Sequence, residues 1–155
     1  MIRQGEMFGE AAFANRPQGG YAQTLEPSWV AVVGLATFEH LLQRNPQVGL
    51  KVASLLGKRL DHYAEWMVDI SLKEVPVRLA SLLLRLCESE GVVTPQGYRI
   101  PTRYTQEQLG YMIGAKRVAI TRAFAQLRET GGVELRNRII HIGDLEALKH
   151  FAGEP

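Results

Sequence analysis

The basic side chains between Tyr104 and Glu129 are the residues of this sequence whose chemistry is easiest to assign. The segment reads YTQEQLGYMIGAKRVAITRAFAQLRE, and Lys116, Arg117 and Arg122 follow one another closely within it. A guanidinium group can donate two parallel hydrogen bonds to a phosphate, or to the O6 and N7 atoms of guanine. The segment therefore predicts either a DNA-binding surface or, more simply, a solvated helical pair.

The distribution of charge favours a polyanion at one end of the chain. The net charge is only +2, but residues 99–138 hold 8 Lys and Arg against 3 Asp and Glu. The rest of the chain holds 10 basic and 13 acidic residues. A basic module beside a mildly acidic one indicates that one end meets DNA. On charge alone, an unevenly charged surface with no partner is an equal alternative.

No other residues form a convincing catalytic or metal-binding set. The histidines at positions 40, 62, 141 and 150 lack the spacing of metal ligands, and Cys87 lies among leucines, as expected of a buried structural thiol. A single cysteine permits no disulfide within the chain and no multi-cysteine metal centre. We expect no enzyme activity, no metal and no cofactor.

The composition is that of an ordinary globular protein, with 46% hydrophobic and 22% charged residues. No apolar run reaches the roughly 20 residues that a membrane span needs, and no basic-then-apolar leader begins the chain. The sequence therefore predicts a cytoplasmic protein without a membrane partner.

The first 34 residues predict strands and turns. Glycines recur at short intervals, prolines stand at positions 17 and 27, and a β-branched run covers residues 30–33. So few strands cannot complete a sheet, and their unpaired edges would need a partner. One or two helical turns are expected from Ala36 to Arg44, ending at Asn45-Pro46.

A long helix is predicted from Pro46 to about Leu72, with proline at its first position. Apolar residues recur along it with alternating spacings of three and four, which is a heptad seam. A helix of about 27 residues is about 40 Å long. The seam could pack within its own domain, but we expect it to pair with a second copy in a parallel homodimer. The seam residues are Ala53, Leu56, Leu60, Tyr63, Met67 and Ile70.

A further helix is predicted from Val75 to Glu90, with Pro76 in its first turn and Gly91 after its end. The junction at Lys73-Glu74 is a candidate hinge. We therefore divide the chain into residues 1–72 and 73–155, and we expect the stretch TPQGYRIP, which follows the helix, to be rich in turns.

The opening segment has the pattern of a helix-turn-helix. Thr105 and Gln108 match a capping box at the start of a first helix, and Gly114 ends it. A second helix is expected from Lys116 to Thr130. Apolar or small residues recur where the two helices would pack together, and the second helix would enter the major groove. These packing positions are Leu109, Gly110, Ile113, Ala115, Ile120 and Ala123.

A basic hairpin follows the second helix. Residues 133–135 and 139–142 read as strands around Arg136-Asn137-Arg138, and a last helix is capped by Asp144. A hairpin in this place is a wing whose cations can contact phosphates. Together these features predict a winged helix-turn-helix that binds double-stranded DNA.

Over nearly its whole length the chain resembles the bacterial Crp-Fnr superfamily of transcription factors, which includes the cyclic-AMP receptor protein and the anaerobic regulators. GEMFGEAAF resembles the phosphate-binding cassette of the family's β-barrel, NPQVGLKVASLLGKRL its long dimerisation helix, and TQEQLGYMIGAKRVAITRAFAQL its winged helix-turn-helix. RVAITR resembles the cyanobacterial nitrogen-control branch. The resemblance implies an α+β fold, with the C-terminal part of a double-stranded β-helix sensor (a cyclic-nucleotide-binding-like domain), a dimerisation helix and the DNA-binding domain.

The departures from this family concern the sensor. The barrel of family members is about twice as long as the sequence before Pro46, so the N-terminal part of the barrel is expected to be absent. Gly9 and Glu10 match the cassette, and we interpret them as its vestige. The Arg-Ser pair that binds the cyclic phosphate is replaced by Gln18-Gly19-Gly20-Tyr21, and the adenine-binding Thr-Ser pair by Tyr63-Ala64. A cyclic phosphate is best bound by a guanidinium. We therefore expect no control by cyclic AMP.

The resemblance also implies roles on DNA. Arg117 and Arg122 would read guanine, Val118 would meet a thymine methyl, and Thr121 would contact phosphate or base. Other cations and hydroxyls would fix the position of the protein without reading sequence. The base-reading residues are thus Arg117, Val118, Thr121 and Arg122, and the phosphate contacts are Lys116, Arg103, Thr105, Arg136 and Arg138.

These observations predict a homodimeric, sequence-specific regulator that acts on a palindromic site, with RNA polymerase as a candidate partner. The alternatives are a dimeric interaction module with weak, sequence-blind DNA binding, or a truncated regulator. Selection of a palindrome at physiological salt separates the first prediction from the interaction module.

Overall fold

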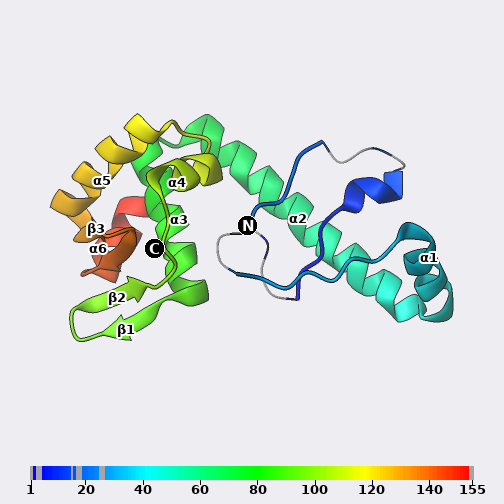
Figure 1. Ribbon diagram of the computed structural model, residues 1–155. Helices are drawn as coiled ribbons and strands as arrows, with labels where there is room; N and C mark the ends of the chain where they lie inside the picture. Colours follow the sequence, from blue (N-terminus) through cyan, green and yellow to red (C-terminus); the bar gives the residue numbers. More distant parts are fainter. Residues whose placement is uncertain (1, 3–4, 15, 17–18, 25–26, 154–155) are drawn as a thin grey trace. The chain divides into compact units, whose positions relative to one another are not determined.

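The computed structural model describes residues 2, 5–14, 16, 19–24 and 27–153, and it forms two compact units that meet between Asp61 and His62. This boundary lies inside the long helix α2, Pro46–Leu72, and not at the predicted junction after residue 72. Figure 1 shows α2 as one continuous helix.

The N-terminal unit contains the short 3-10 helix η1, Glu10–Ala14, the helix α1, Leu35–Arg44, and the first part of α2. Phe13 stacks on Phe38 of α1, with ring centroids 5.3 Å apart. The predicted strands are not present among the described residues before Leu35. The run Val30–Val33 is exposed, and within the described residues it forms no hydrogen-bonded ladder with a neighbouring strand.

The predicted helices 36–44 and 46–72 are both confirmed. Asn45 ends α1, and its backbone N–H donates to the carbonyl of Leu41. Pro46 begins α2. The N–H of a first helical residue has no acceptor within the helix, so the lack of an N–H in proline costs no hydrogen bond there. No residue described in α2 is buried.

The C-terminal unit is built on α3, Val75–Glu90, whose bounds agree with the sequence pattern. The helices α4, Gln106–Ile113, α5, Arg117–Gly131, and α6, Leu145–Ala152, follow in the chain. The strands β1, Val92–Thr94, β2, Gly97–Ile100, β3, Val133–Arg136, and β4, Ile139–Ile142, form one antiparallel sheet in the order β1-β2-β4-β3.

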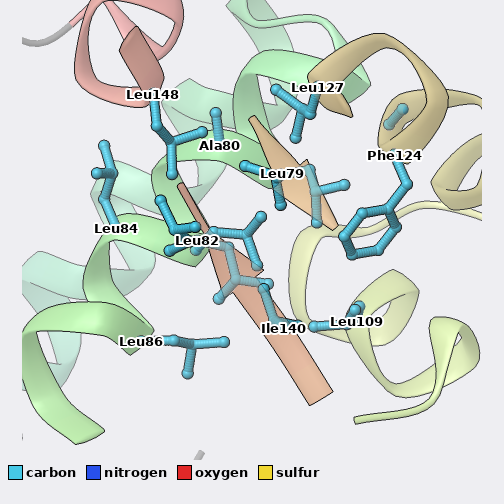
Figure 2. Close-up of a cluster of buried hydrophobic side chains, with 14 of the residues drawn as sticks. Leu79, Ala80, Leu82, Leu84, Leu86, Leu109, Phe124, Leu127, Ile140 and Leu148 are labelled. Atoms are coloured by element: carbon cyan, nitrogen blue, oxygen red, sulfur yellow. The ribbon is translucent and has the colours of Figure 1, made fainter. Parts of the chain in front are cut away.

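One hydrophobic core holds this unit together (Figure 2). Leucines of α3 lie at its centre, and Leu79 and Leu83 are fully buried. Each buried leucine contributes about 1.5–3 kcal/mol relative to an exposed one. The core also takes Leu109 from α4, Leu127 from α5 and Ile140 from the sheet, so it fixes the two helices of the predicted helix-turn-helix on a common base.

The hairpin β1–β2 was not foreseen as strands, because its sequence reads only as rich in turns. Thr94 pairs with Gly97 across the turn, and Ile100 pairs with Ile140 of β4. That second pairing joins residues 40 positions apart and leaves no local signal in the sequence. The predicted wing, by contrast, is confirmed as β3 and β4, as is the Asp144 cap of α6.

Candidate nucleic-acid interface

The start of α4 is held by the predicted capping box. The N–H of Gln108 donates to the hydroxyl of Thr105 at 3.1 Å, and the N–H of Thr105 donates to the side-chain oxygen of Gln108 at 2.8 Å. Both bonds satisfy backbone donors that the first turn of a helix leaves free. The first turn of α4 is therefore capped by two side-chain hydrogen bonds.

Two glycines, Gly110 inside α4 and Gly114 at its end, shape the turn between α4 and α5. Gly114 ends α4 with φ 65°, a left-handed conformation that favours glycine, and the N–H of Ala115 closes back on the carbonyl of Gly110 at 2.9 Å. A Cβ at Gly110 would stand 2.4 Å from the Ala115 carbonyl oxygen. A side chain at position 110 would therefore force the backbone at Ala115 to shift.

The expected packing positions of the two helices lie where the pattern puts them. Leu109, Gly110, Ile113, Ile120 and Ala123 are buried, and Ala115 is half-buried. Because one face of α5 is buried by this packing, the opposite face is exposed to solvent. The helix-turn-helix geometry is confirmed.

The four predicted base-reading residues share that outer face. Arg117, Val118, Thr121 and Arg122 are all exposed and together line one shallow hollow. Arg117 and Thr121 are four residues apart, as are Val118 and Arg122, so each pair occupies neighbouring positions on the helical surface. Such a face on a helix of this length can enter the major groove of B-DNA.

Thr121 also contacts a residue that the sequence did not point to. Its hydroxyl donates to the side-chain oxygen of Gln106 at 2.7 Å and lies 3.2 Å from the carbonyl oxygen of Arg117. Gln106 is the first residue of α4. The two residues are 15 positions apart on different helices, so no local pattern could reveal the bond.

The predicted phosphate contacts come from the N-cap of α5, the loop before α4 and the wing. Lys116 is the exposed N-cap of α5, and Arg103 is exposed in the loop before α4. The half-buried hydroxyl of Thr105 accepts the capping bond from Gln108. In the wing, Arg136 forms an ion pair with Glu134, whereas Arg138 lies exposed in the turn.

Tyr104 connects the wing to the start of α4. Its ring is fully buried, its hydroxyl donates to Glu90 at 2.6 Å, and its N–H donates to the carbonyl of Arg138 at 3.1 Å. These bonds link the end of α3, the loop before α4 and the tip of the wing. The tip of the wing is therefore fastened to the end of α3 and to the loop that enters α4.

An open groove lies between the start of α3 and the side of α5. Its lining holds the cations Lys73, Arg78, Lys116 and Arg122 together with the acidic Glu74, and Lys73 forms an ion pair with Asp69 at 2.9 Å. Arg78 is 9% exposed and donates to the carbonyl of Ile70 at 3.0 Å, while its Nε has no partner among the described residues. Clustered cations in a concave surface raise the local concentration of anions.

The last turns of α2 contact the turn of the helix-turn-helix. The indole N–H of Trp66 donates to the carbonyl of Met112 at 3.2 Å, which satisfies an acceptor that the end of α4 leaves free. A Cβ at Gly114 would stand 2.9 Å from Cδ1 of Ile70. Sequence reasoning missed Trp66, because it lies beside the heptad seam and not in it.

The predicted seam residues remain accessible along much of α2. Leu60, Tyr63 and Met67 are 68%, 56% and 62% exposed, and Ala53 is also exposed. Leu56 is half-buried. Ile70 is half-buried as well, and it faces the Gly114 turn.

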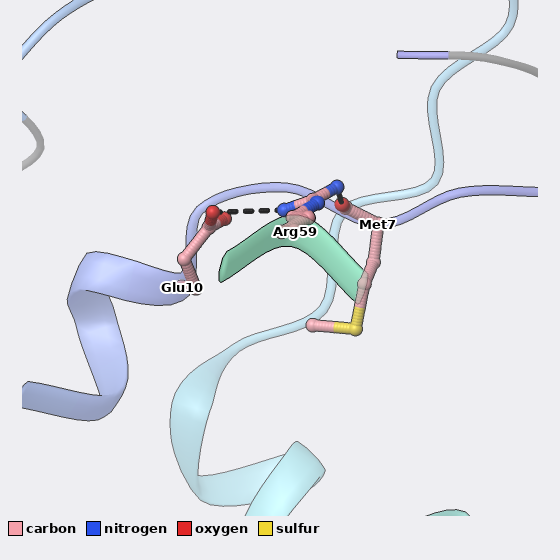
Figure 3. A network of polar contacts seen from close by, with 3 residues as sticks. All are labelled: Met7, Glu10 and Arg59. Carbon is pink, nitrogen blue, oxygen red and sulfur yellow. Dashed lines mark hydrogen bonds and ion pairs between the residues drawn. The ribbon is translucent and has the colours of Figure 1, made fainter. Parts of the chain in front are cut away.

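Glu10, one of the two cassette residues, is paired within the N-terminal unit (Figure 3). Its carboxylate lies 2.8 Å from Arg59 of α2, and Arg59 also donates to the carbonyl of Met7. A hydrogen bond from its own backbone, opposed by partial burial and reinforced by Arg59, holds the pKa of Glu10 below its usual value. Gly9 precedes it with φ 95°.

Sequence reasoning missed Arg59, because 49 residues separate it from Glu10. Gln18, part of the sequence that stands where the family has its phosphate-binding pair, lies outside the described residues.

The remaining candidates show no further site. Cys87 is buried, and burial, followed by the nearby charge of Glu88, raises the pKa of its thiol. No cluster of three or more His, Cys, Asp or Glu side chains suited to a metal occurs among the residues described. In the same part of the chain, no helix combines the length and apolar character needed to cross a membrane.

Comparison with known proteins agrees with this geometry. The Crp-like helix-turn-helix domain family matches residues 77–151. The cAMP-activated global transcriptional regulator CRP of Pasteurella multocida is 26% identical over 83% of this chain and 62% of its own length. The Global nitrogen regulator of Synechocystis sp. is 24% identical over 96% of this chain and 67% of its own length.

A solved structure of a CooA variant from Carboxydothermus hydrogenoformans has the same fold. Its TM-score is 0.69 at 23% identity, over 76% of this chain and 55% of that one. The chain thus spans between about half and two thirds of the length of these relatives. Residues 77–151 form a Crp-like helix-turn-helix domain, and the rest of the chain is similar in sequence to these regulators.

Proposed function

We propose that this chain is a sequence-specific DNA-binding transcription regulator that acts as a homodimer on a palindromic site. The observation that carries the proposal is the outer face of α5. Arg117 and Arg122 stand exposed on it with Val118 and Thr121 between them, above a packed and capped helix pair. Two arginines at this spacing can donate bidentately to guanines along the floor of the major groove.

Exposed cations outside the outer face of α5 also support the proposal. Lys116 at the N-cap of α5 and Arg138 in the turn of the wing are both exposed. Arg103 adds a cation before α4. Cations at the rim of a recognition helix bind phosphates and set its register without reading bases.

The homodimer is supported by the exposed stripe on α2. Leu60, Tyr63 and Met67 recur at heptad spacing and are each more than half exposed. Two copies of such a stripe bury each other in a parallel pair. A two-fold symmetric dimer then reads two half-sites one or more turns of DNA apart, about 34 Å or a multiple of it.

Control by cyclic AMP forms no part of this proposal, although the Pasteurella relative is described as cAMP-activated. A cyclic phosphate needs a guanidinium, and the guanidinium of Arg59, which contacts the cassette, is engaged by Glu10 and by the carbonyl of Met7. RNA polymerase is a candidate partner for such a regulator. We assign no catalytic role to the chain.

Selection from random DNA duplexes tests the proposal. The full chain, without a small molecule and at near-physiological salt, is expected to enrich a palindrome, and added cyclic AMP is expected to leave the enrichment unchanged. Arg117→Ala should relax the preference at one base pair of each half-site, a loss of about 1–3 kcal/mol per contact. Binding without any sequence preference would overturn the proposal and favour the interaction module.

A further inference from the structure

We infer that Gln106 is a positioning residue that engages the hydroxyl proton of Thr121. Thr121 can then only accept a hydrogen bond from a base, and it accepts one from the amino group of adenine or cytosine. The inference rests on the proposed function, because it needs α5 to lie in the major groove. It adds the class of base that one position of each half-site must carry.

The chemistry begins with the single proton of a hydroxyl group. A threonine hydroxyl has one donor and two acceptor lone pairs, and its proton rotates toward whichever acceptor is best placed. A free threonine therefore contacts any base, donating to the O6 of guanine or the O4 of thymine and accepting from amino groups. By itself Thr121 would carry little sequence information.

The hydrogen bond to Gln106 removes this ambiguity. The 2.7 Å separation from the Gln106 side-chain oxygen is the usual length of an O–H···O bond. The Arg117 carbonyl at 3.2 Å lies beyond the usual range for a hydroxyl donor. The proton of Thr121 is therefore committed to Gln106, and only lone pairs remain for a base.

The backbone position of Gln106 is suited to accepting the hydrogen bond from Thr121. It is half-buried at the first position of α4, directly after Thr105, whose two capping bonds fix the backbone there. Thr121 lies exposed in the hollow that it shares with Arg117 and Arg122. The acceptor therefore lies on the face that carries the guanidinium groups, between the two arginines in sequence.

The groups on the major-groove edge of each base then determine which bases Thr121 should prefer. Adenine and cytosine present amino donors at N6 and N4, whereas guanine and thymine present carbonyl acceptors at O6 and O4. A lone-pair acceptor at Thr121 favours adenine and cytosine. Opposite guanine or thymine, the hydroxyl oxygen would face a carbonyl oxygen with no proton between them. At one position of one strand, the protein should prefer adenine or cytosine over guanine or thymine.

The experiment measures binding of the full chain to duplexes that carry each of the four bases at every position of the selected half-site. The wild type should show the amino-base preference at one position, on the order of three- to tenfold, the effect of one net hydrogen bond. Thr121→Val, which keeps the shape of the side chain but loses the hydroxyl, should lose the preference.

Gln106 is tested by a pair of variants with a matched control. Gln106→Ala should reduce the preference below about twofold, because the freed hydroxyl can again donate. Gln106→Glu retains an acceptor at the same reach and should restore the preference, even where its charge weakens binding to all sequences. Gln96→Ala, in the exposed turn of β1–β2, should change neither property.

Each outcome bears on the inference. A wild-type preference for guanine or thymine at that position would overturn it, as would a preference that survives Thr121→Val or Gln106→Ala. Loss of the preference in Gln106→Ala without recovery in Gln106→Glu would also contradict it, because that pattern points to lost helix packing. If the wild type selects no sequence, the proposed function fails. If Arg117 still selects guanine while the amino-base preference is missing, only this inference fails.

Discussion

At the scale of single residues, Arg138 occupies a backbone conformation that is unfavourable for a residue with a side chain. Asn137 and Arg138 form the two-residue turn of the wing, with φ angles of 51° and 65°. Two-residue hairpins with both φ angles positive favour Asn-Gly, because a Cβ in this conformation is strained. The wing carries asparagine at the first position and an exposed arginine at the second.

We expect Arg138→Gly to stabilise the protein and weaken its binding to DNA. Removing the Cβ should raise the free energy of unfolding by about 1 kcal/mol, since the Tyr104 hydrogen bond uses only the carbonyl at this position. Loss of one phosphate contact should lower affinity for all sequences and reduce the slope of log affinity against log salt by about 1. Thermal unfolding and salt titration measure the two effects. Arg138→Lys keeps the charge and the strain, and unchanged affinity in the glycine variant would remove Arg138 from the interface.

At the scale of elements, the parts that could be predicted are those whose signals are local. The bounds of α2 and α3, the capping box at Thr105 and the wing all follow from periodicity, caps and turns within a few residues. The missed features join distant residues, as in the β2–β4 pairing and the bond between Gln106 and Thr121. The strands expected before Leu35 fail for a related reason, because strands form only with a pairing partner.

We expect Gly114→Ala to destabilise the protein by about 1–3 kcal/mol, more than Gly153→Ala. Both glycines end a helix in the left-handed conformation, with φ of 65° and 74°. A Cβ at Gly153 meets open space, whereas one at Gly114 would stand 2.9 Å from Cδ1 of Ile70. The difference between the two variants in chemical denaturation therefore isolates the contact between α2 and the turn. Equal losses would show that backbone strain alone accounts for the effect.

At the scale of the whole molecule, residues along α2 have two kinds of surroundings. Trp66 and Ile70 contact the helix-turn-helix, while Leu60, Tyr63 and Met67 remain exposed at heptad spacing. The sequence pattern alone assigned Ile70 to the seam, because periodicity does not distinguish a residue that packs within its own chain from one that packs against a second copy. Pairing through the remaining stripe would place two recognition helices about one two-fold axis.

A charge placed in the middle of this stripe should separate the two copies. Leu60 is 68% exposed in the single chain, and its burial in a dimer stabilises by about 1.5–3 kcal/mol for each copy. Leu60→Glu removes both contributions and adds two like charges, so the dimer dissociation constant should rise at least about 100-fold. Sedimentation equilibrium measures this change, with Ser54→Glu, at an exposed position of α2 off the seam, as the control. The separated chains should bind a half-site as well as the full palindrome, because only a dimer gains from the second half-site. A Leu60→Glu variant that stays dimeric would move the interface away from α2.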